Sequence, residues 1–130
     1  MTYRSLEEDA VTDMISIIDD DVAVRDMLVS LVRSLGYDAR GFASAEEFLG
    51  SREFSRFTCA IADIHMPGMS GLELKERLDA SNESLPVIMI TARTELGLEE
   101  KAFSKGAVGF LRKPFEVERL IGFIEKALKK

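Results

Sequence analysis

The chain has 130 residues, of which 46% are hydrophobic and 31% are charged, and this composition is typical of one globular domain with a hydrophobic core. A net charge of −6 argues against nonspecific attraction of this domain to nucleic acid or to a membrane surface. The one cysteine, Cys59, cannot form an internal disulfide, and we expect it to be a core residue. Because no apolar run approaches the ~18 residues of a membrane span either, we expect a cytoplasmic location.

Five short segments with strand character follow a polar start. Residues 1–13 show no clear periodicity, and we expect a flexible leader there, followed by a single domain over residues 14–130. Most of the strand segments are continuous apolar runs, which are typical of strands buried on both faces. The predicted strands are 14–18 (MISII), 37–42 (YDARGF), 59–63 (CAIAD), 87–90 (VIMI) and 108–111 (VGFL).

Each predicted strand is followed by a segment with hydrophobic residues at helical spacing. Ser44–Glu47 and Ser70–Glu73 match the capping box that opens a helix, and Gly36 suits the end of the first helix. The five predicted helices carry their apolar positions at 24–35, from residue 44 onward, at 70–78, at 98–106 and at 117–128.

The strict alternation of strands and helices predicts an α/β fold. Parallel strands joined by right-handed crossovers place helices on both faces of the sheet. Five strands suit an open, doubly wound parallel sheet, for which we expect the order 2-1-3-4-5. In such a sheet ligands bind beyond the carboxyl ends of the strands, at the point where the strand order reverses. Functional residues are therefore expected at the ends of strands one and three.

Acidic residues collect at those two strand ends. Asp19, Asp20 and Asp21 follow the first strand, and Asp63 ends the third. Carboxylates that face each other repel, and the repulsion is relieved by raised pKa values or by a bound cation. Oxygen ligands without a His or Cys cluster favour a hard ion, so the sequence predicts a Mg²⁺ site. Asp20 or Asp21 could instead cap the first helix, and we assign Asp21 mainly to that cap.

The residues at the ends of the fourth and fifth predicted strands supply further groups that phosphoryl transfer to Asp63 would use. A carboxylate beside a metal ion can attack phosphorus and form an aspartyl-phosphate, and Asp63 is placed for this role. Lys113 can supply a cation, and Thr91 a hydroxyl donor, for the phosphoryl oxygens. Taken singly, Thr91 is an ordinary strand-end residue and Lys113 a solvated loop charge, so the prediction depends on their joint placement.

Four motifs, "IIDDD", "ADIHMPGMSG", "ITA" and "LRKPF", resemble the receiver domain of two-component response regulators, a flavodoxin-like fold. The resemblance covers about Met14–Lys129, and "GFASAEEFLG" with "MPGMSGLEL" is similar to the FixJ-type branch. It implies Asp19 and Asp20 as the acidic metal pair and Asp63 as both phospho-acceptor and metal ligand.

The same resemblance assigns roles to three further residues. It implies Thr91 as the switch hydroxyl and Lys113, before a cis peptide to Pro114, as the cation that contacts the phosphoryl group. It implies Phe110 as the switch aromatic, which would turn inward from a more exposed rotamer, although plain core packing suits Phe110 equally well. For His65 we expect an exposed rim residue whose backbone carbonyl lies near the metal.

The function implied is a phosphorylation-dependent signalling switch. The domain would accept a phosphoryl group from a sensor histidine kinase with Mg²⁺ and change the surface formed by its fourth helix, fifth strand and fifth helix. That surface would contact a second copy or a downstream partner, for instance a DNA-binding effector domain absent from this chain. We expect no direct nucleic-acid or membrane binding, and no enzyme activity beyond self-phosphorylation and slow self-dephosphorylation.

Three other functions use a similar fold. A pseudo-receiver would bind proteins without being phosphorylated, but such modules usually lack one or more of the site residues found here. A metal-dependent phosphatase with an aspartyl nucleophile usually carries a second acid two residues later, where this chain has His65. A flavin-binding domain would need a Ser/Thr/Gly-rich phosphate loop after the first strand, where this chain has three acids that would repel phosphate.

Overall fold

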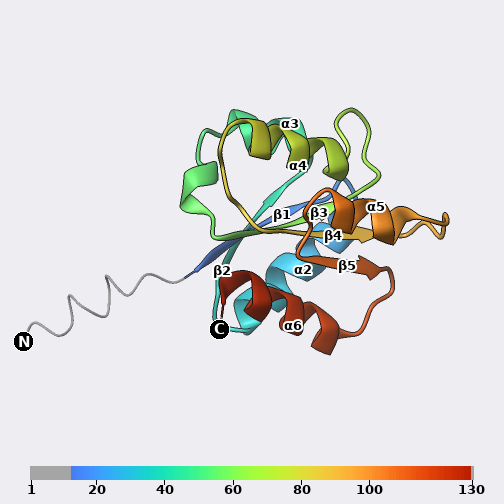
Figure 1. Cartoon of the computed structure of the whole chain (residues 1–130). Helices are drawn as coiled ribbons and strands as arrows, with labels where there is room; N and C mark the ends of the chain where they lie inside the picture. Colours follow the sequence, from blue (N-terminus) through green and yellow to red (C-terminus); the bar gives the residue numbers. More distant parts are fainter. Residues whose placement is uncertain (1–12, 130) are drawn as a thin grey trace, which may run out of the picture.

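The computed structural model describes residues 13–129, so the predicted leader, apart from its last residue, lies outside the described residues. The described chain forms a five-stranded parallel sheet with the order β2-β1-β3-β4-β5, which confirms the predicted fold and strand order (Figure 1). The strands are β1 (Met14–Ile18), β2 (Asp38–Phe42), β3 (Cys59–Asp63), β4 (Val87–Thr91) and β5 (Gly109–Arg112).

Within residues 13–129, five α-helices connect or follow the strands, as predicted, and a short 3₁₀ turn, η1, precedes β3. The helices are α2 (Val22–Ser34), α3 (Ala45–Gly50), α4 (Gly71–Ala80), α5 (Leu98–Ser104) and α6 (Val117–Leu128), and η1 spans Phe54–Arg56. The fourth and fifth predicted helices are therefore α5 and α6. Among the described residues no helix is both long and apolar enough to cross a membrane.

The helices form a layer on each face of the sheet. Helices α3 and α4 cover one face and α2 and α6 cover the other (Figure 1), while Leu98 and Ala102 of α5 join the core on the α3–α4 side. Strand β3 lies in the middle of the sheet with β4 beside it, and both are buried along their whole length. Burial raises the pKa of the Cys59 thiol to about 12, so Cys59 is a core residue, as expected.

The helix ends follow the sequence signals. The Asp21 side chain accepts the N–H groups of Ala23 and Val24 and caps α2, in agreement with its assignment from the sequence. Ser70 and Glu73 form a complete capping box at the start of α4. Gly36, with a φ of +99°, follows α2 in the left-handed conformation that favours glycine. These caps set where each helix begins or ends relative to the edge of the sheet.

Candidate functional site

The predicted site residues lie at one edge of the sheet, where the strands end. Asp19 directly follows β1, Asp63 ends β3, Thr91 ends β4 and Lys113 directly follows β5. The backbone N–H of Lys113 donates to the carbonyl of Thr91 at 2.8 Å, which holds the ends of β4 and β5 in line. The structure thus brings the four residues together at the edge predicted from the strand order.

Asp19, Asp20 and Asp63 form an acidic cluster in which one carboxylate oxygen of each lies within 4.8 Å of the others. Asp19 is fully buried, Asp63 is 6% exposed and Asp20 is exposed. Carboxylates at this separation repel each other, and a divalent cation between them removes the repulsion. The donors are all oxygens, which is the ligand type that Mg²⁺ prefers. The residues present therefore fit a magnesium ion.

Asp19 is held in place from three sides. Its Oδ2 accepts a hydrogen bond from Lys113 Nζ at 3.0 Å, and its Oδ1 accepts the backbone N–H of Asp21 at 2.9 Å. Its backbone carbonyl accepts a hydrogen bond from Nη1 of Arg25, on α2, at 2.7 Å. Arg25 was missed by the sequence reasoning, because nothing in its surroundings along the chain distinguishes it from another polar helix residue.

Lys113 lies between two of the acids. Its Nζ is 3.0 Å from Oδ2 of Asp19 and 3.5 Å from Oδ2 of Asp63. Burial raises the pKa of Asp63 above the usual range, the charge of Asp19 raises it further, and Lys113 and the His65 N–H oppose this only in part. Burial alone would lower the pKa of Lys113, but Asp19 and Asp63 outweigh burial and raise that pKa. Negative charge therefore dominates the site.

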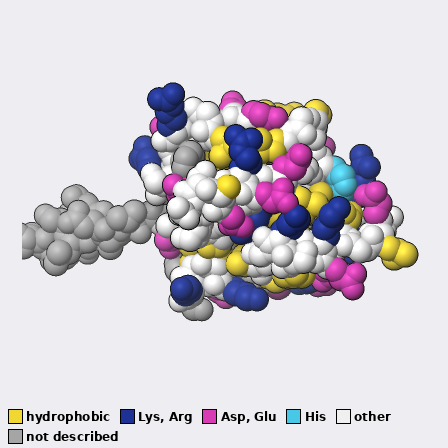
Figure 2. Space-filling view, turned by 45° about the horizontal axis from the view of Figure 1, so that its top comes forward, with side chains coloured by type: hydrophobic (Ala, Val, Ile, Leu, Met, Phe, Trp, Pro, Cys, Tyr) yellow, Lys and Arg dark blue, Asp and Glu magenta, His cyan; other side chains and the backbone are white. Residues whose placement is uncertain are grey.

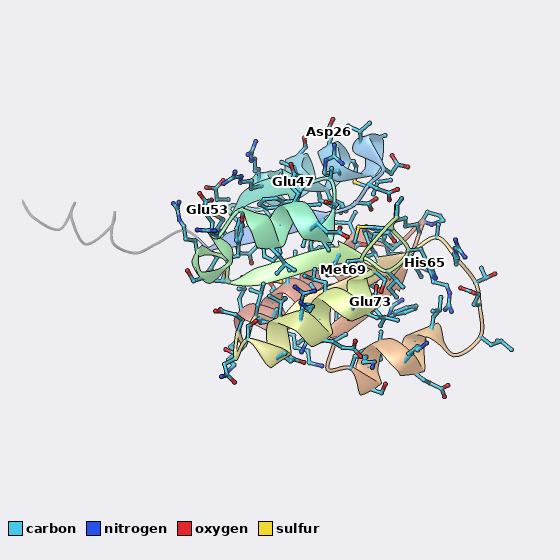
Figure 3. All side chains as sticks on the ribbon, turned by 90° about the horizontal axis from the view of Figure 1, so that it is seen from above. Asp26, Glu47, Glu53, His65, Met69 and Glu73 are labelled. Carbon is cyan, nitrogen blue, oxygen red and sulfur yellow. The ribbon has the colours of Figure 1, made fainter. Side chains whose placement is uncertain are left out.

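The His65 side chain is not the exposed rim group expected from the sequence. It is 27% exposed, its Nδ1 lies 3.0 Å from Oγ1 of the buried Thr91, and its Nε2 lies 3.2 Å from Oε1 of Glu95. Figure 2 shows the histidine side chain, in cyan, at the surface beside acidic and basic groups, and Figure 3 shows His65 near the start of α4. The prediction was wrong because Thr91 and Glu95 hold the ring against the edge of the sheet; the role of the His65 carbonyl as a metal ligand stays a prediction.

Phe110 lies on β5 and is only 3% exposed, so the more exposed starting rotamer expected from the sequence was wrong. It is part of the core on the side of α3, α4 and α5. The guanidinium carbon of Arg112 lies 5.1 Å from the centre of the Phe110 ring. Nε and Nη2 of Arg112 donate to the backbone carbonyls of Arg93 and Glu95, each at 3.3 Å. Arg112 therefore connects Phe110 to the loop that follows β4.

The backbone around the acidic cluster is tightly packed. A Cβ atom on Gly71 would lie 2.6 Å from the backbone oxygen of Asp63, so only glycine fits at the start of α4 without displacing the end of β3. The N–H of Gly71 donates to the carbonyl of Ile64 at 3.0 Å, which closes the loop between β3 and α4. The peptide bond between Lys113 and Pro114 is cis, as the resemblance implies.

Known proteins are similar to this chain in sequence and in fold. The family model described as "Response regulator receiver domain" matches residues 15–125. Response regulator protein TodT of Pseudomonas putida is 43% identical over 116 residues, which are 89% of this chain and 51% of TodT. Transcriptional regulatory protein FixJ of Bradyrhizobium diazoefficiens is 39% identical over 115 residues, or 88% of this chain and 56% of FixJ. The chain thus spans about half the length of these relatives.

Solved structures agree with the sequence comparisons. FixJ-N matches with a TM-score of 0.83 and 33% identity, covering 92% of this chain and 95% of FixJ-N. The response regulator StyR matches with a TM-score of 0.84 and 38% identity, covering 92% of this chain and 60% of StyR. The chain belongs to the receiver domain family of two-component response regulators, among its FixJ-like members.

Proposed function

We propose that this domain is a cytoplasmic signalling switch that accepts a phosphoryl group from a sensor histidine kinase onto Asp63, with Mg²⁺. The observation that carries the proposal is that the three clustered acids differ in burial and in their hydrogen bonds. Both carboxylate oxygens of Asp19 already accept hydrogen bonds, one from Lys113 and one from the Asp21 N–H. Asp20 is exposed. Asp63 is buried at the strand end and lies 3.5 Å from the Lys113 ammonium, at the limit of a hydrogen bond.

The proposed transfer needs little from the protein beyond position and charge. An Asp63 carboxylate oxygen forms the new P–O bond, the P–N bond of the phosphohistidine donor breaks, and the released imidazole takes a proton from solvent. Lys113 then neutralises charge on the phosphoryl oxygens. Asp19, Asp20, Asp63 and the His65 carbonyl are the proposed holders of Mg²⁺, which when bound neutralises further charge on those oxygens.

An apolar groove beside the site supports a protein as the phosphoryl donor. The groove has a volume of about 380 Å³ and lies between α2 and the loop before α6, next to Lys113. Met27 is 47% exposed and Val117 is 39% exposed, and both line the same groove, so they contribute to one contiguous apolar surface of the kind that marks protein contacts. The groove is lined by Val24, Met27, Leu31, Lys113, Pro114, Phe115 and Val117. We propose that the kinase covers this groove while its phosphohistidine faces Asp63.

The surface of α5, β5 and α6 is the proposed output face. Phe103 is 41% exposed on α5, and Leu96 is 99% exposed in the loop before it. A hollow of about 320 Å³ on this face is lined by four charged and three apolar residues, a mixture that suits contact with a second copy or an effector domain. The relatives TodT and FixJ are about twice as long as the matched region, so a DNA-binding effector domain is the partner we propose for the output.

Two measurements test the function. Incubation with acetyl phosphate and Mg²⁺ should add one phosphoryl group by intact-protein mass spectrometry, and Asp63→Asn should abolish it because an amide cannot form the acyl-phosphate. Labelling of the Asp63→Asn variant at the level of the parent would overturn the assignment. Absence of label on the parent would favour a pseudo-receiver.

A variant in the apolar groove tests kinase docking separately from the phosphorylation of Asp63. Met27→Asp places a charge in the apolar groove but leaves the acidic cluster intact. It should slow transfer from a phosphorylated kinase and leave labelling by acetyl phosphate unchanged. Equal transfer rates for the variant and the parent would contradict the docking proposal and leave the assignment of Asp63 standing.

A further inference from the structure

The imidazole of His65 bridges two residues that belong to the end of β4 and the loop after it. Its Nδ1 lies 3.0 Å from Oγ1 of Thr91, and its Nε2 lies 3.2 Å from Oε1 of Glu95. Thr91 is fully buried, and its Oγ1 also accepts the backbone N–H of Arg93 at 3.0 Å. The three side chains form a continuous chain from the surface to the end of β4.

The hydrogen-bond partners of His65 decide which of its ring nitrogens carries a proton. The Glu95 carboxylate can only accept, so Nε2 of His65 must donate to it. In the neutral imidazole the other nitrogen, Nδ1, is then an acceptor. The Thr91 oxygen already accepts the Arg93 N–H, so its hydroxyl proton is free to donate to Nδ1. With a neutral imidazole, the Thr91 hydroxyl therefore donates to Nδ1 of His65.

We propose that His65 is a positioning residue that holds the Thr91 hydroxyl in the unphosphorylated domain and competes with the phosphoryl group on Asp63 for its proton. The inference rests on the proposed function, in which the Thr91 hydroxyl serves the phosphoryl oxygens. A hydroxyl has one proton, so it cannot donate to His65 and to the phosphoryl group at the same time. Activation thus requires that the bond between Thr91 and His65 breaks.

Glu95 connects the hydrogen bond between Thr91 and His65 to the proposed output face. Its carboxylate orients the His65 ring, while its backbone carbonyl accepts a hydrogen bond from Nη2 of Arg112 at 3.3 Å. The Arg112 guanidinium lies over the ring of the buried Phe110. The loop between β4 and α5 is therefore held by His65 on the side of the site and by Arg112 on the side of Phe110. Release of Thr91 from His65 loosens the first of these two contacts.

The test is a titration with beryllofluoride, a phosphoryl mimic, at constant Mg²⁺ and pH 8, followed by amide shifts in NMR. His65→Phe keeps an aromatic ring but has no acceptor, so it should lower the midpoint by about two- to tenfold, the worth of one hydrogen bond. His65→Asn can place its Oδ1 where Nδ1 lies, and its midpoint should stay near that of the parent. Glu95→Ala should lower the midpoint less than His65→Phe, because Nδ1 remains but the ring is no longer oriented.

A double-mutant cycle separates this role from a structural one. In the Thr91→Val background there is no hydroxyl to release, so adding His65→Phe should leave the midpoint unchanged. An equal shift in both backgrounds, or a midpoint for His65→Phe at or above that of the parent, would overturn the inference. A parent that takes up no beryllofluoride would instead contradict the proposed function, which keeps the two failures distinguishable.

Discussion

Neutralising Asp20 should stabilise the metal-free domain. The Asp20 carboxylate lies in the cluster with Asp19 and Asp63, each pair within 4.8 Å. Asp19 also holds Lys113 and the Asp21 N–H, so its removal would leave a partly buried ammonium with a poorer partner. Asp20 is exposed and contributes mainly repulsion. Asp20→Asn is therefore the change that relieves the negative charge without disturbing the hydrogen bonds of Asp19.

The size of the effect follows from Coulomb's law. Two unit charges 4.8 Å apart repel by about 0.9 kcal/mol in water and about 3.5 kcal/mol at an effective dielectric constant near 20. Exposure places Asp20 toward the lower value, and the Lys113 charge offsets part of the repulsion. We expect the free energy of unfolding to rise by about 1 kcal/mol, which corresponds to about 3–5 °C in Tm for a domain of this size.

The assay compares thermal unfolding in EDTA and in saturating Mg²⁺. In EDTA the Asp20→Asn variant should melt above the parent, and in Mg²⁺ it should gain less, because it has lost a ligand. At ten times the dissociation constant the parent should gain about 1.4 kcal/mol from the metal. Asp26→Asn, on α2 away from His65 and the start of α4 (Figure 3), is the matched control and should alter neither curve. An Asp20→Asn variant that melts below the parent in EDTA, or gains as much from Mg²⁺, would refute the reasoning.

Three further changes have defined outcomes. Ser16 Oγ is buried and has no hydrogen-bond partner among the described residues, so Ser16→Ala should raise the free energy of unfolding by about 1 kcal/mol in denaturant melts. Gly71→Ala would push a Cβ to 2.6 Å from the Asp63 oxygen and should lower stability by about 1–3 kcal/mol and slow acetyl phosphate labelling. The pKa of Asp63 is raised, first by burial and then by Asp19, so the folded state binds the extra proton and stability falls as pH rises through that pKa. Asp63→Asn should therefore melt above the parent at neutral pH, and the difference should vanish below the usual carboxyl range.

The fold was predictable from local patterns. The bounds of β1 and β3 match the prediction, because continuous apolar runs define strands that are buried on both faces. The predicted bounds of β2 and β4 differ from the structure by one residue at one end, and both ends of β5 lie one residue later than predicted, because strand ends depend on pairing with a neighbour and not on composition. The turn η1 was missed, since three residues carry no periodicity.

The site was predictable only to the level of the strand ends. Strand order places Asp19, Asp63 and Lys113 at one edge whatever their rotamers, so their proximity follows from topology. Side-chain directions do not follow from topology. The ring of His65 turns back toward Thr91, and no spacing in the sequence indicates that the exposed loop residue Glu95 would hold it there.

The raised pKa of Lys113 shows why the binding of a metal ion and the phosphorylation of Asp63 should favour each other. Burial should lower the pKa of Lys113, yet that pKa is raised, which means that the acids outweigh burial. In the proposed reaction a carboxylate with one charge becomes an aspartyl-phosphate with about two, so negative charge is added where it already dominates. Lys113 is shared with Asp19 and cannot compensate alone. A bound cation should therefore favour the phosphorylated form, and by thermodynamic linkage a phosphoryl group, or beryllofluoride, should tighten Mg²⁺ binding by the same factor.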